Sequence, residues 1–256
     1  MRGRVGILAL GLSLTAILTT ARAAEQQIDT GTDPTKLSRN AQVRFERLEL
    51  RDGFSNNTLY LRFTQPLGAA QRSSLESKLP IVSSDVLGDS SYGIGDFSLK
   101  LSHLPVLTQK YGILLTLEAI FDTADEADHG FGSNVLKPGI TYARFLAGGS
   151  LFAPTVQHAF TVGSTDSSRT DVSSTVIDLY YVPKLKDPRT YMTIDPALTY
   201  DWESEKLSPS LAVTLGRVIR TALPGTSSVF IKPSVGFSDD RAYDWGLEVG
   251  FKVVGF

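Results

Sequence analysis

The sequence predicts an all-β protein, a transmembrane antiparallel β-barrel of about twelve strands (ten to fourteen) that follows a cleaved signal peptide. Three observations predict this fold class. Apolar and polar residues alternate along most of the chain, as in strands with one apolar and one polar face. The alternating segments are about as long as the roughly 9 to 11 residues that cross a membrane at a tilt. Aromatic residues lie near the ends of the apolar faces, as in interfacial girdles.

Residues 1–23 are predicted to be a secretory signal peptide. Arg2 and Arg4 precede an apolar run over residues 5–18, and the small residues of 21–24 place the cleavage site after Ala23. The apolar run is shorter than the roughly 20 residues of a spanning helix, which favours a signal over an N-terminal anchor. Residues 24–40 are polar and have no period, so we expect a flexible periplasmic leader ahead of a barrel over residues 41–256.

The composition excludes several classes of function. Removing residues 1–23 takes away three arginines, which lowers the count of basic residues from 25 to 22 against 27 acidic residues. A mildly acidic chain without basic runs has no footprint for nucleic acid. Because the chain has no cysteine, disulfide scaffolds, zinc–thiolate sites and thiol catalysis are excluded. We expect no cofactor.

The first half of the barrel is predicted from seven segments. Their ranges are 42–50, 59–65, 79–83, 97–103, 111–121, 136–146 and 152–162. The clearest is 111–121, in which Leu115 and Leu117 alternate with Thr116 and Glu118. In 42–50 the alternation slips after Glu46, which suggests a β-bulge.

The second half is more regular. Its ranges are 175–181, 191–202, 207–215, 229–237 and 243–253. In 191–202, Ile194 and Leu198 share an apolar face, and Thr193 and Asp195 lie on the opposite face. Prolines 138, 154, 196, 209 and 233 all fall on apolar faces, although proline removes a hydrogen-bond donor from the sheet. We expect local bulges at Pro196 and Pro233.

Alternation also fits a soluble β-sandwich or a lipocalin-like barrel, but segment length and the aromatic residues favour lipid outside. With an even strand count, both termini are periplasmic. The connections 51–56, 85–91, 122–133, 164–171, 203–206 and 238–242 then face outward and carry most loop acids. The connections at the other end carry Arg72, Lys110, Lys186, Arg189 and Arg220.

The chain ends on Phe256, like the C-terminal strand that the barrel-assembly machinery recognises. The apolar residues of the last strand are Trp245, Leu247, Val249, Phe251 and Val253, so Phe256 is out of register by one residue unless a terminal bulge intervenes. The expected surroundings are the lipid and lipopolysaccharide of a Gram-negative outer membrane.

Several short stretches resemble a known family. They are 92–97 (Tyr-Gly-Ile-Gly-Asp-Phe), 119–121 (Ala-Ile-Phe), 130–133 (Gly-Phe-Gly-Ser), 136–139 (Leu-Lys-Pro-Gly), 33–36 (Asp-Pro-Thr-Lys), 152–154 (Phe-Ala-Pro) and 166–169 (Asp-Ser-Ser-Arg). The chain resembles the transporter-like outer-membrane proteins of the "meta-pathway of phenol degradation" family over most of its mature length. The resemblance implies passage of small organic solutes, aromatic or otherwise hydrophobic, and it carries no catalytic motif.

Thirteen charged residues are expected to line the lumen. They are Arg44, Arg62, Lys100, Lys137, Lys232 and Lys252, with Glu46, Asp96, Glu118, Asp178, Asp195, Asp244 and Glu248. So many charges do not sit unpaired in a dry core. They fit a hydrated pore that passes small solutes. They fit equally well a plug of salt bridges that fills a narrow, structural barrel.

Two further readings concern chemistry. A membrane-embedded lipid hydrolase would use a Ser and His pair, but His103, His129 and His158 lack a Gly-x-Ser-x-Gly elbow, so the protein is predicted not to be an enzyme. The loop 122–130 holds four carboxylates and an imidazole, which suits calcium. Because it lacks the spacing of an EF-hand, a solvated acidic loop is the favoured interpretation.

Overall fold

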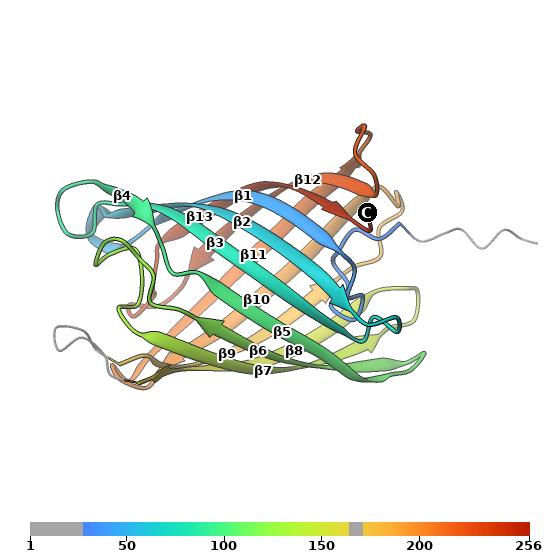
Figure 1. Cartoon of the computed structure of the whole chain (residues 1–256), viewed down its shortest axis with the longest axis horizontal. Coiled ribbons are helices and arrows are strands. Elements are labelled where there is room, and N and C mark those ends of the chain that lie inside the picture. The colour runs from blue at the N-terminus through green and yellow to red at the C-terminus, as the bar shows by residue number, and fades with distance from the viewer. Residues whose placement is uncertain (1–27, 164–170) are drawn as a thin grey trace, which may run out of the picture.

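Long antiparallel strands close into one barrel (Figure 1). The computed structural model describes residues 28–163 and 171–256, so the predicted signal peptide and most of the 164–171 connection lie outside the described residues. The strands are β1 (Asn40–Glu49), β2 (Ser55–Leu67), β3 (Ser73–Ser84), β4 (Ser91–Ile94), β5 (Ser98–Leu107), β6 (Tyr111–Ile120), β7 (Asn134–Phe145), β8 (Leu151–Val162), β9 (Ser173–Val182), β10 (Thr190–Asp201), β11 (Lys206–Ile219), β12 (Thr226–Gly236) and β13 (Trp245–Val254).

The pairing of β1 with β13 closes the sheet. Asn40 lies opposite Val254 and Glu49 opposite Trp245. The remaining pairs join strands that follow one another in the sequence, except that β4 and β5 do not pair with each other. The short β4 and the longer β5 both pair with β3, one after the other along its length. Together β4 and β5 therefore occupy the position of one strand in the barrel wall. The predicted twelve-stranded barrel is confirmed. Among the described residues, no helix is long and apolar enough to span a membrane.

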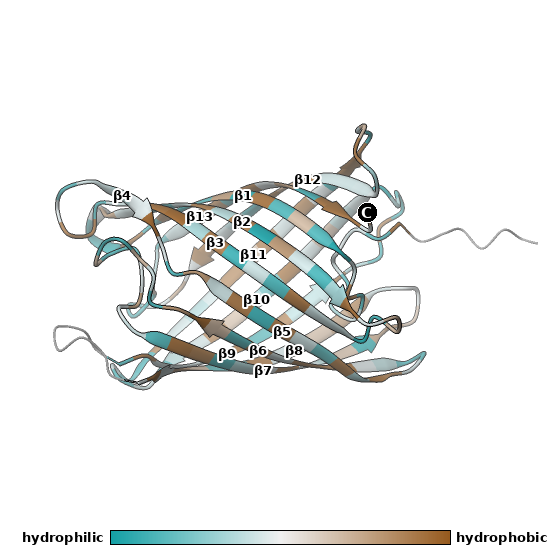
Figure 2. Ribbon diagram, in the orientation of Figure 1, coloured by the Kyte–Doolittle hydropathy of each residue, from teal (hydrophilic) through white to brown (hydrophobic). Residues whose placement is uncertain are grey.

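The two faces of the wall differ in polarity because side chains alternate along each strand. On β6, Leu117 is 45% exposed and the adjacent Glu118 is 5% exposed. On β13, the outward Val249 is 41% exposed and the inward Glu248 is 6% exposed. Brown and teal segments accordingly alternate along the strands in Figure 2. The exposed face is apolar and the enclosed face is polar, as the sequence pattern predicts.

The bulge expected after Glu46 is absent. The register of β1 runs without a shift against both neighbours, from Asn40 to Glu49. The alternation slips because Arg47 points outward near the strand end, where its Nη2 lies 2.9 Å from Oε2 of Glu49. The polar pair stands on the outer face, so the backbone needs no extra residue.

The bulges expected at Pro196 and Pro233 are also absent. Bridge pairs are missing beside each proline on one flank, but the register is the same before and after the gap. The sheet therefore accepts proline by losing local hydrogen bonds on one side. The described residues show a register shift between His103 and Val106, where β5 pairs with β6.

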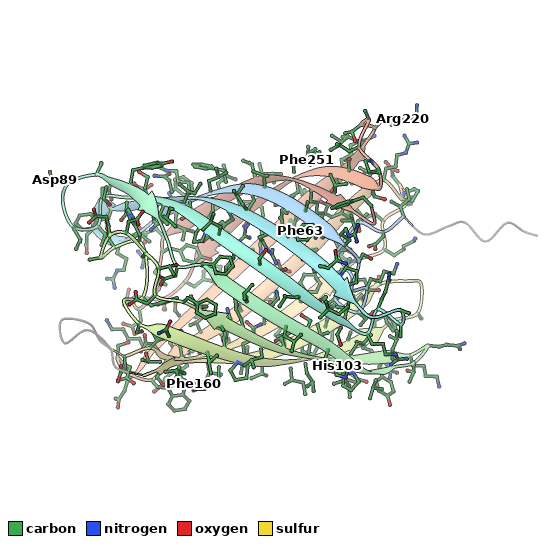
Figure 3. All side chains as sticks on the ribbon, viewed as in Figure 1. Phe63, Asp89, His103, Phe160, Arg220 and Phe251 are labelled. Atoms are coloured by element: carbon green, nitrogen blue, oxygen red, sulfur yellow. The ribbon has the colours of Figure 1, made fainter. Side chains whose placement is uncertain are left out.

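The barrel has two distinct ends. We call the end that carries the chain termini the terminus end, and the opposite end the loop end (Figure 1). Asp89 lies at the loop end and Arg220 at the terminus end (Figure 3). This arrangement follows the predicted division of the connections, with most acidic loops at one end and the basic turns at the other.

Residues 28–39 do not form a leader separate from the barrel. The hydroxyl of Tyr180, on β9, donates a hydrogen bond to the carbonyl of Thr32 (2.8 Å), and Thr35 is buried. A Cβ added at Gly112, on β6, would lie 2.9 Å from Cγ2 of Thr35, and one added at Gly31 would lie 3.2 Å from Val254 of β13. The segment thus contacts strands on opposite sides of the opening, which the polar, aperiodic sequence did not predict.

The C-terminal residues leave the sheet. Strand β13 ends at Val254, and Gly255 adopts a φ of 74°, which favours glycine. Phe256 is therefore not returned to the apolar register by a bulge. Its ring lies 5.8 Å from Cζ of Arg39, just before β1.

Candidate functional site

The barrel interior holds most of the charged residues that the sequence placed on the polar faces. Glu118 on β6 accepts contacts from Lys78 of β3 (2.9 Å) and Lys137 of β7 (3.0 Å). It also accepts a hydrogen bond from Ser98 (2.7 Å). These partners lie on strands to both sides of β6, so the ion pairs connect side chains of several neighbouring strands.

A second cluster centres on Glu76 of β3. Its two carboxylate oxygens contact Arg62 (2.7 Å) and Lys100 (2.9 Å). Nearby on the closing strands, Arg44 of β1 contacts Glu248 of β13 at 2.6 Å. Such buried pairs satisfy both charges, and removing one partner leaves an uncompensated charge.

Glu46 and the opposite wall complete the set. Glu46 lies across from Glu248 in the register of β1 with β13. On β10, Asp195 contacts Lys232 of β12 at 3.2 Å. Oδ1 of Asp195 and Oδ1 of Asp178 on β9 have no hydrogen-bond partner among the described residues. Oδ1 of Asn40, in the cavity lining, is another acceptor without a partner among the described residues.

Lys252 on β13 is held by aromatic rings. Its Nζ lies 4.6 Å from the ring centroid of Tyr191 and 5.9 Å from that of Phe230. Within residues 28–163 and 171–256, no carboxylate lies within ion-pair distance of this ammonium group. Lys252 itself is 8% exposed.

Two interior residues were missed by the sequence analysis. Glu76 and Lys78 belong to β3, which begins at Ser73 rather than at the expected residue 79. The start of this strand is rich in serine, so its apolar face was hard to recognise. The hairpin offered a signal, because Lys78 lies opposite Arg62 and Glu76 opposite Thr64 of β2.

Asp96 and Asp244 are not wall residues of a strand, contrary to the expectation. Asp96 follows β4 and accepts backbone N–H groups of Thr123 (3.1 Å), Ala124 (3.1 Å) and Phe131 (2.6 Å). Asp244 precedes β13 and accepts a hydrogen bond from Nε of Arg241 (2.6 Å). Both carboxylates hold loops at the loop end, since the strands end or break before reaching them.

A cavity of about 340 Å³ occupies the interior. It is lined by wall residues of β1, β2, β3, β5, β6 and β9–β13, and by residues 31–38 of the leader. The described leader therefore bounds the cavity at the terminus end. A volume of this size is at the lower end of the range for small-molecule sites, roughly 300 to 1,000 Å³.

Each histidine has a hydroxyl partner. Nε2 of His129 lies 2.7 Å from Oγ of Ser91, and Nδ1 of His158 lies 2.9 Å from Oγ1 of Thr175. Nδ1 of His103 lies 2.9 Å from Oγ of Ser73 at the wall surface. His158 lies on the outer face, as expected, because its ring stacks with that of the exposed Phe160 two residues along β8. Figure 3 labels Phe160.

The pair of His129 and Ser91 lacks the geometry of a catalytic triad. Asp128 approaches the same Nε2 atom, at 3.6 Å, and Nδ1 has no hydrogen-bond partner among the described residues. A triad needs an acid on the second nitrogen to orient the ring. Burial raises the pKa of Asp128, but hydrogen bonds from Ser84 and Ser91 outweigh burial and lower it overall.

The acidic loop of residues 122–130 packs against β4 through hydrogen bonds. Asp125 Oδ2 accepts the N–H of Ile94 (2.9 Å), and Asp125 N–H donates to the carbonyl of Ile94 (2.9 Å). In the part of the chain that the structure describes, no group of three or more acidic or histidine side chains is arranged to hold a metal ion. Asp125, and Asp128 through a hydrogen bond from Ser91 (3.0 Å), fix this loop to β4.

Comparisons with known proteins agree on the fold. No family model and no curated protein matches the sequence. An outer-membrane channel from Pseudomonas putida F1 is similar over 88% of this chain and 98% of its own, with a TM-score of 0.72 and 14% identity.

Two porins are also similar. The NanC porin matches 85% of this chain and 99% of its own (TM-score 0.55, 9% identity), and the KdgM porin matches 84% and 98% (TM-score 0.51, 12% identity). At these identities the likeness establishes the fold, and the resemblance to the phenol-degradation family stays a prediction. The chain has the twelve-stranded fold of an outer-membrane barrel.

Proposed function

We propose that this protein is a channel of the outer membrane of a Gram-negative bacterium, through which small organic solutes pass by passive diffusion. The contrast between the two faces of the wall carries the proposal. The outer face exposes valine, leucine, isoleucine and phenylalanine, and the inner face carries ion pairs around a cavity. Charged lumen walls set ion preference and orient polar solutes in porins.

The membrane part of the proposal predicts a difference between neighbouring residues. Leu117→Arg, on the outer face, is expected to cost roughly 2 to 4 kcal/mol, because it places a charge against lipid. Thr116→Arg, one residue away on the inner face, is the matched control and is expected to cost less, since that face is hydrated. Urea unfolding in lipid vesicles measures both losses. Equal losses would contradict a lipid-facing outer wall.

In this proposal the terminus end faces the periplasm and the loop end faces outward. Lipid and lipopolysaccharide then surround the wall, and the barrel-assembly machinery engages the C-terminal strand. The solutes are small organic molecules, and the family resemblance suggests aromatic or hydrophobic ones. A plugged structural barrel is the second candidate, because residues 31–38 of the leader bound the cavity.

Planar-bilayer recording of the purified protein tests the channel. We expect small unitary steps whose ion preference moves toward anions in Asp178→Asn with Asp195→Asn, since a free acceptor of each lies buried in the wall. Asp239→Asn with Asp240→Asn, in an exposed connection, is the control, because salt screens exposed charges within about 10 Å. A silent bilayer, together with unchanged uptake of small aromatics in a deletion strain, would overturn the channel.

A further inference from the structure

The interior cavity has an excess of positive charge. Its lining includes six cationic side chains and four carboxylates. Three of the carboxylates already have cationic partners: Glu76, Glu248 and Asp195. The fourth, Asp33, accepts hydrogen bonds from the N–H and hydroxyl of Thr35 within the leader. The cavity lining therefore holds more cationic side chains than carboxylates.

Lys252 is the buried cation of this lining that has no ion-pair partner among the described residues. It is 8% exposed, and no carboxylate of the described residues lies within ion-pair distance. Its ammonium group lies over the rings of Tyr191 and Phe230. Ring faces attract a cation and reduce the cost of its burial, but they do not neutralise its charge. The charge remains available to an anion that enters the cavity.

Each of the two rings lies over a glycine on the neighbouring strand, where the absence of a side chain leaves space for the ring. Gly216 lies opposite Tyr191, and a Cβ at this position would overlap the ring. Gly250 lies opposite Phe230, and its Cβ would lie 2.5 Å from that ring. The Tyr191 hydroxyl is fixed at 3.3 Å from Oγ of Ser228. The rings are thus preorganised around the ammonium group, and each glycine is needed for close approach.

We infer that Lys252, Tyr191 and Phe230 form a subsite for a small aromatic carboxylate. The ammonium group pairs with the carboxylate, and the parts of the two rings that line the cavity give apolar contact to the body of the solute. The inference rests on the proposed channel and names the class of solute that its lumen retains.

The leader gives Lys252 a competing role. A Cβ on Gly31 would lie 3.6 Å from Nζ of Lys252, so the leader backbone passes close to the ammonium group. If Lys252 served only to hold the leader, its loss would change the open conductance and leave solute binding unchanged. The experiment separates these two roles.

Isothermal titration calorimetry of the full mature protein in detergent tests the subsite, with benzoate, acetate and benzylamine as probes. Benzoate is expected to bind more tightly than either of the others. Lys252→Met is expected to weaken benzoate roughly tenfold, the loss of one charge-assisted contact. Phe230→Leu is expected to weaken benzoate and not acetate. Lys78→Met, which removes an interior lysine paired with Glu118, is the matched control.

Heat-modified migration on gels verifies that each variant folds. Unchanged benzoate affinity in folded Lys252→Met, or equal affinity for benzoate and benzylamine, would overturn the subsite. Higher conductance in Lys252→Met with unchanged benzoate affinity would assign Lys252 to the leader and overturn it too. Silent bilayers with benzoate affinity lost in Lys252→Met would reject the channel and support the subsite.

Discussion

The segments at the two ends of the barrel are attached by different means. At the loop end, residues 121–133 are docked by several hydrogen bonds, among them three backbone N–H groups donated to Asp96. At the terminus end, one hydrogen bond, from Tyr180 to Thr32, joins residues 28–38 to the strands in the described structure. The other hydrogen bonds of residues 28–38 are internal, such as Ser38 to Asp29 (2.6 Å). Arg39, which follows them, donates a hydrogen bond to Gln65 of β2 (2.9 Å). The loop at one end is fixed by several hydrogen bonds, and the segment at the other end rests against the wall with one.

The difference indicates which of the two segments is able to move. A carboxylate that accepts several N–H groups forms charge-assisted bonds, which are stronger than neutral ones. A segment held by one neutral hydrogen bond and by packing is displaced at lower cost. We therefore expect the leader to open while the loop of residues 121–133 stays in place. Three measurements test this expectation.

The largest effect is expected from Asp96→Asn. An amide has one acceptor oxygen in place of two and carries no charge, so part of the docking is lost and stability falls by roughly 2 to 4 kcal/mol. Limited proteolysis should then cleave within 121–133, and urea unfolding measures the loss. Asp122→Asn, an exposed carboxylate of the same loop, is the control. Intact loops in Asp96→Asn would show that the Asp96 carboxylate does not hold this loop.

A smaller effect is expected from Tyr180→Phe, which removes the hydrogen bond to the leader. The loss of about 1 kcal/mol should raise the displaced fraction roughly fivefold. Because the chain has no cysteine, Thr35→Cys introduces a single thiol at a buried leader position. Its rate of maleimide labelling measures displacement. Tyr92→Phe, at the exposed loop end, is the control and should leave the labelling rate unchanged. A labelling rate in Tyr180→Phe equal to that of the parent Thr35→Cys protein would contradict a mobile leader.

The smallest effect is expected from pH. The pKa of Asp128 is lowered from 3.8 because hydrogen bonds from Ser84 and Ser91 outweigh the effect of burial. A carboxyl with a depressed pKa stabilises the fold above its unfolded pKa, and that stability is lost as pH falls through the folded pKa. Proteolytic protection of 121–133 should hold at neutral pH and decline below about pH 4. The decline should be smaller in Asp128→Asn.

The sequence predicted the wall better than its ends. Period-two alternation is local, so it assigns Leu117 to one face and Glu118 to the other without reference to any other strand. The twelve strands follow from the same rule. The rule failed to predict the start of β3, where serines make the apolar face hard to recognise. It also failed at Arg47, which forms an ion pair with Glu49 on the outer face.

The sequence by itself determined the strand number, the apolar outer face and the polar residues of most inner positions, because each depends on neighbours along the chain. Tertiary structure alone decided that Glu118 has two cationic partners. It also decided that Lys252 lies beside two aromatic rings and, among the described residues, has no carboxylate partner. It also decided the use of Asp96 as a loop anchor and the insertion of residues 28–39. Partners across strands depend on register and closure, which bring together residues far apart in the chain, and no local period encodes them.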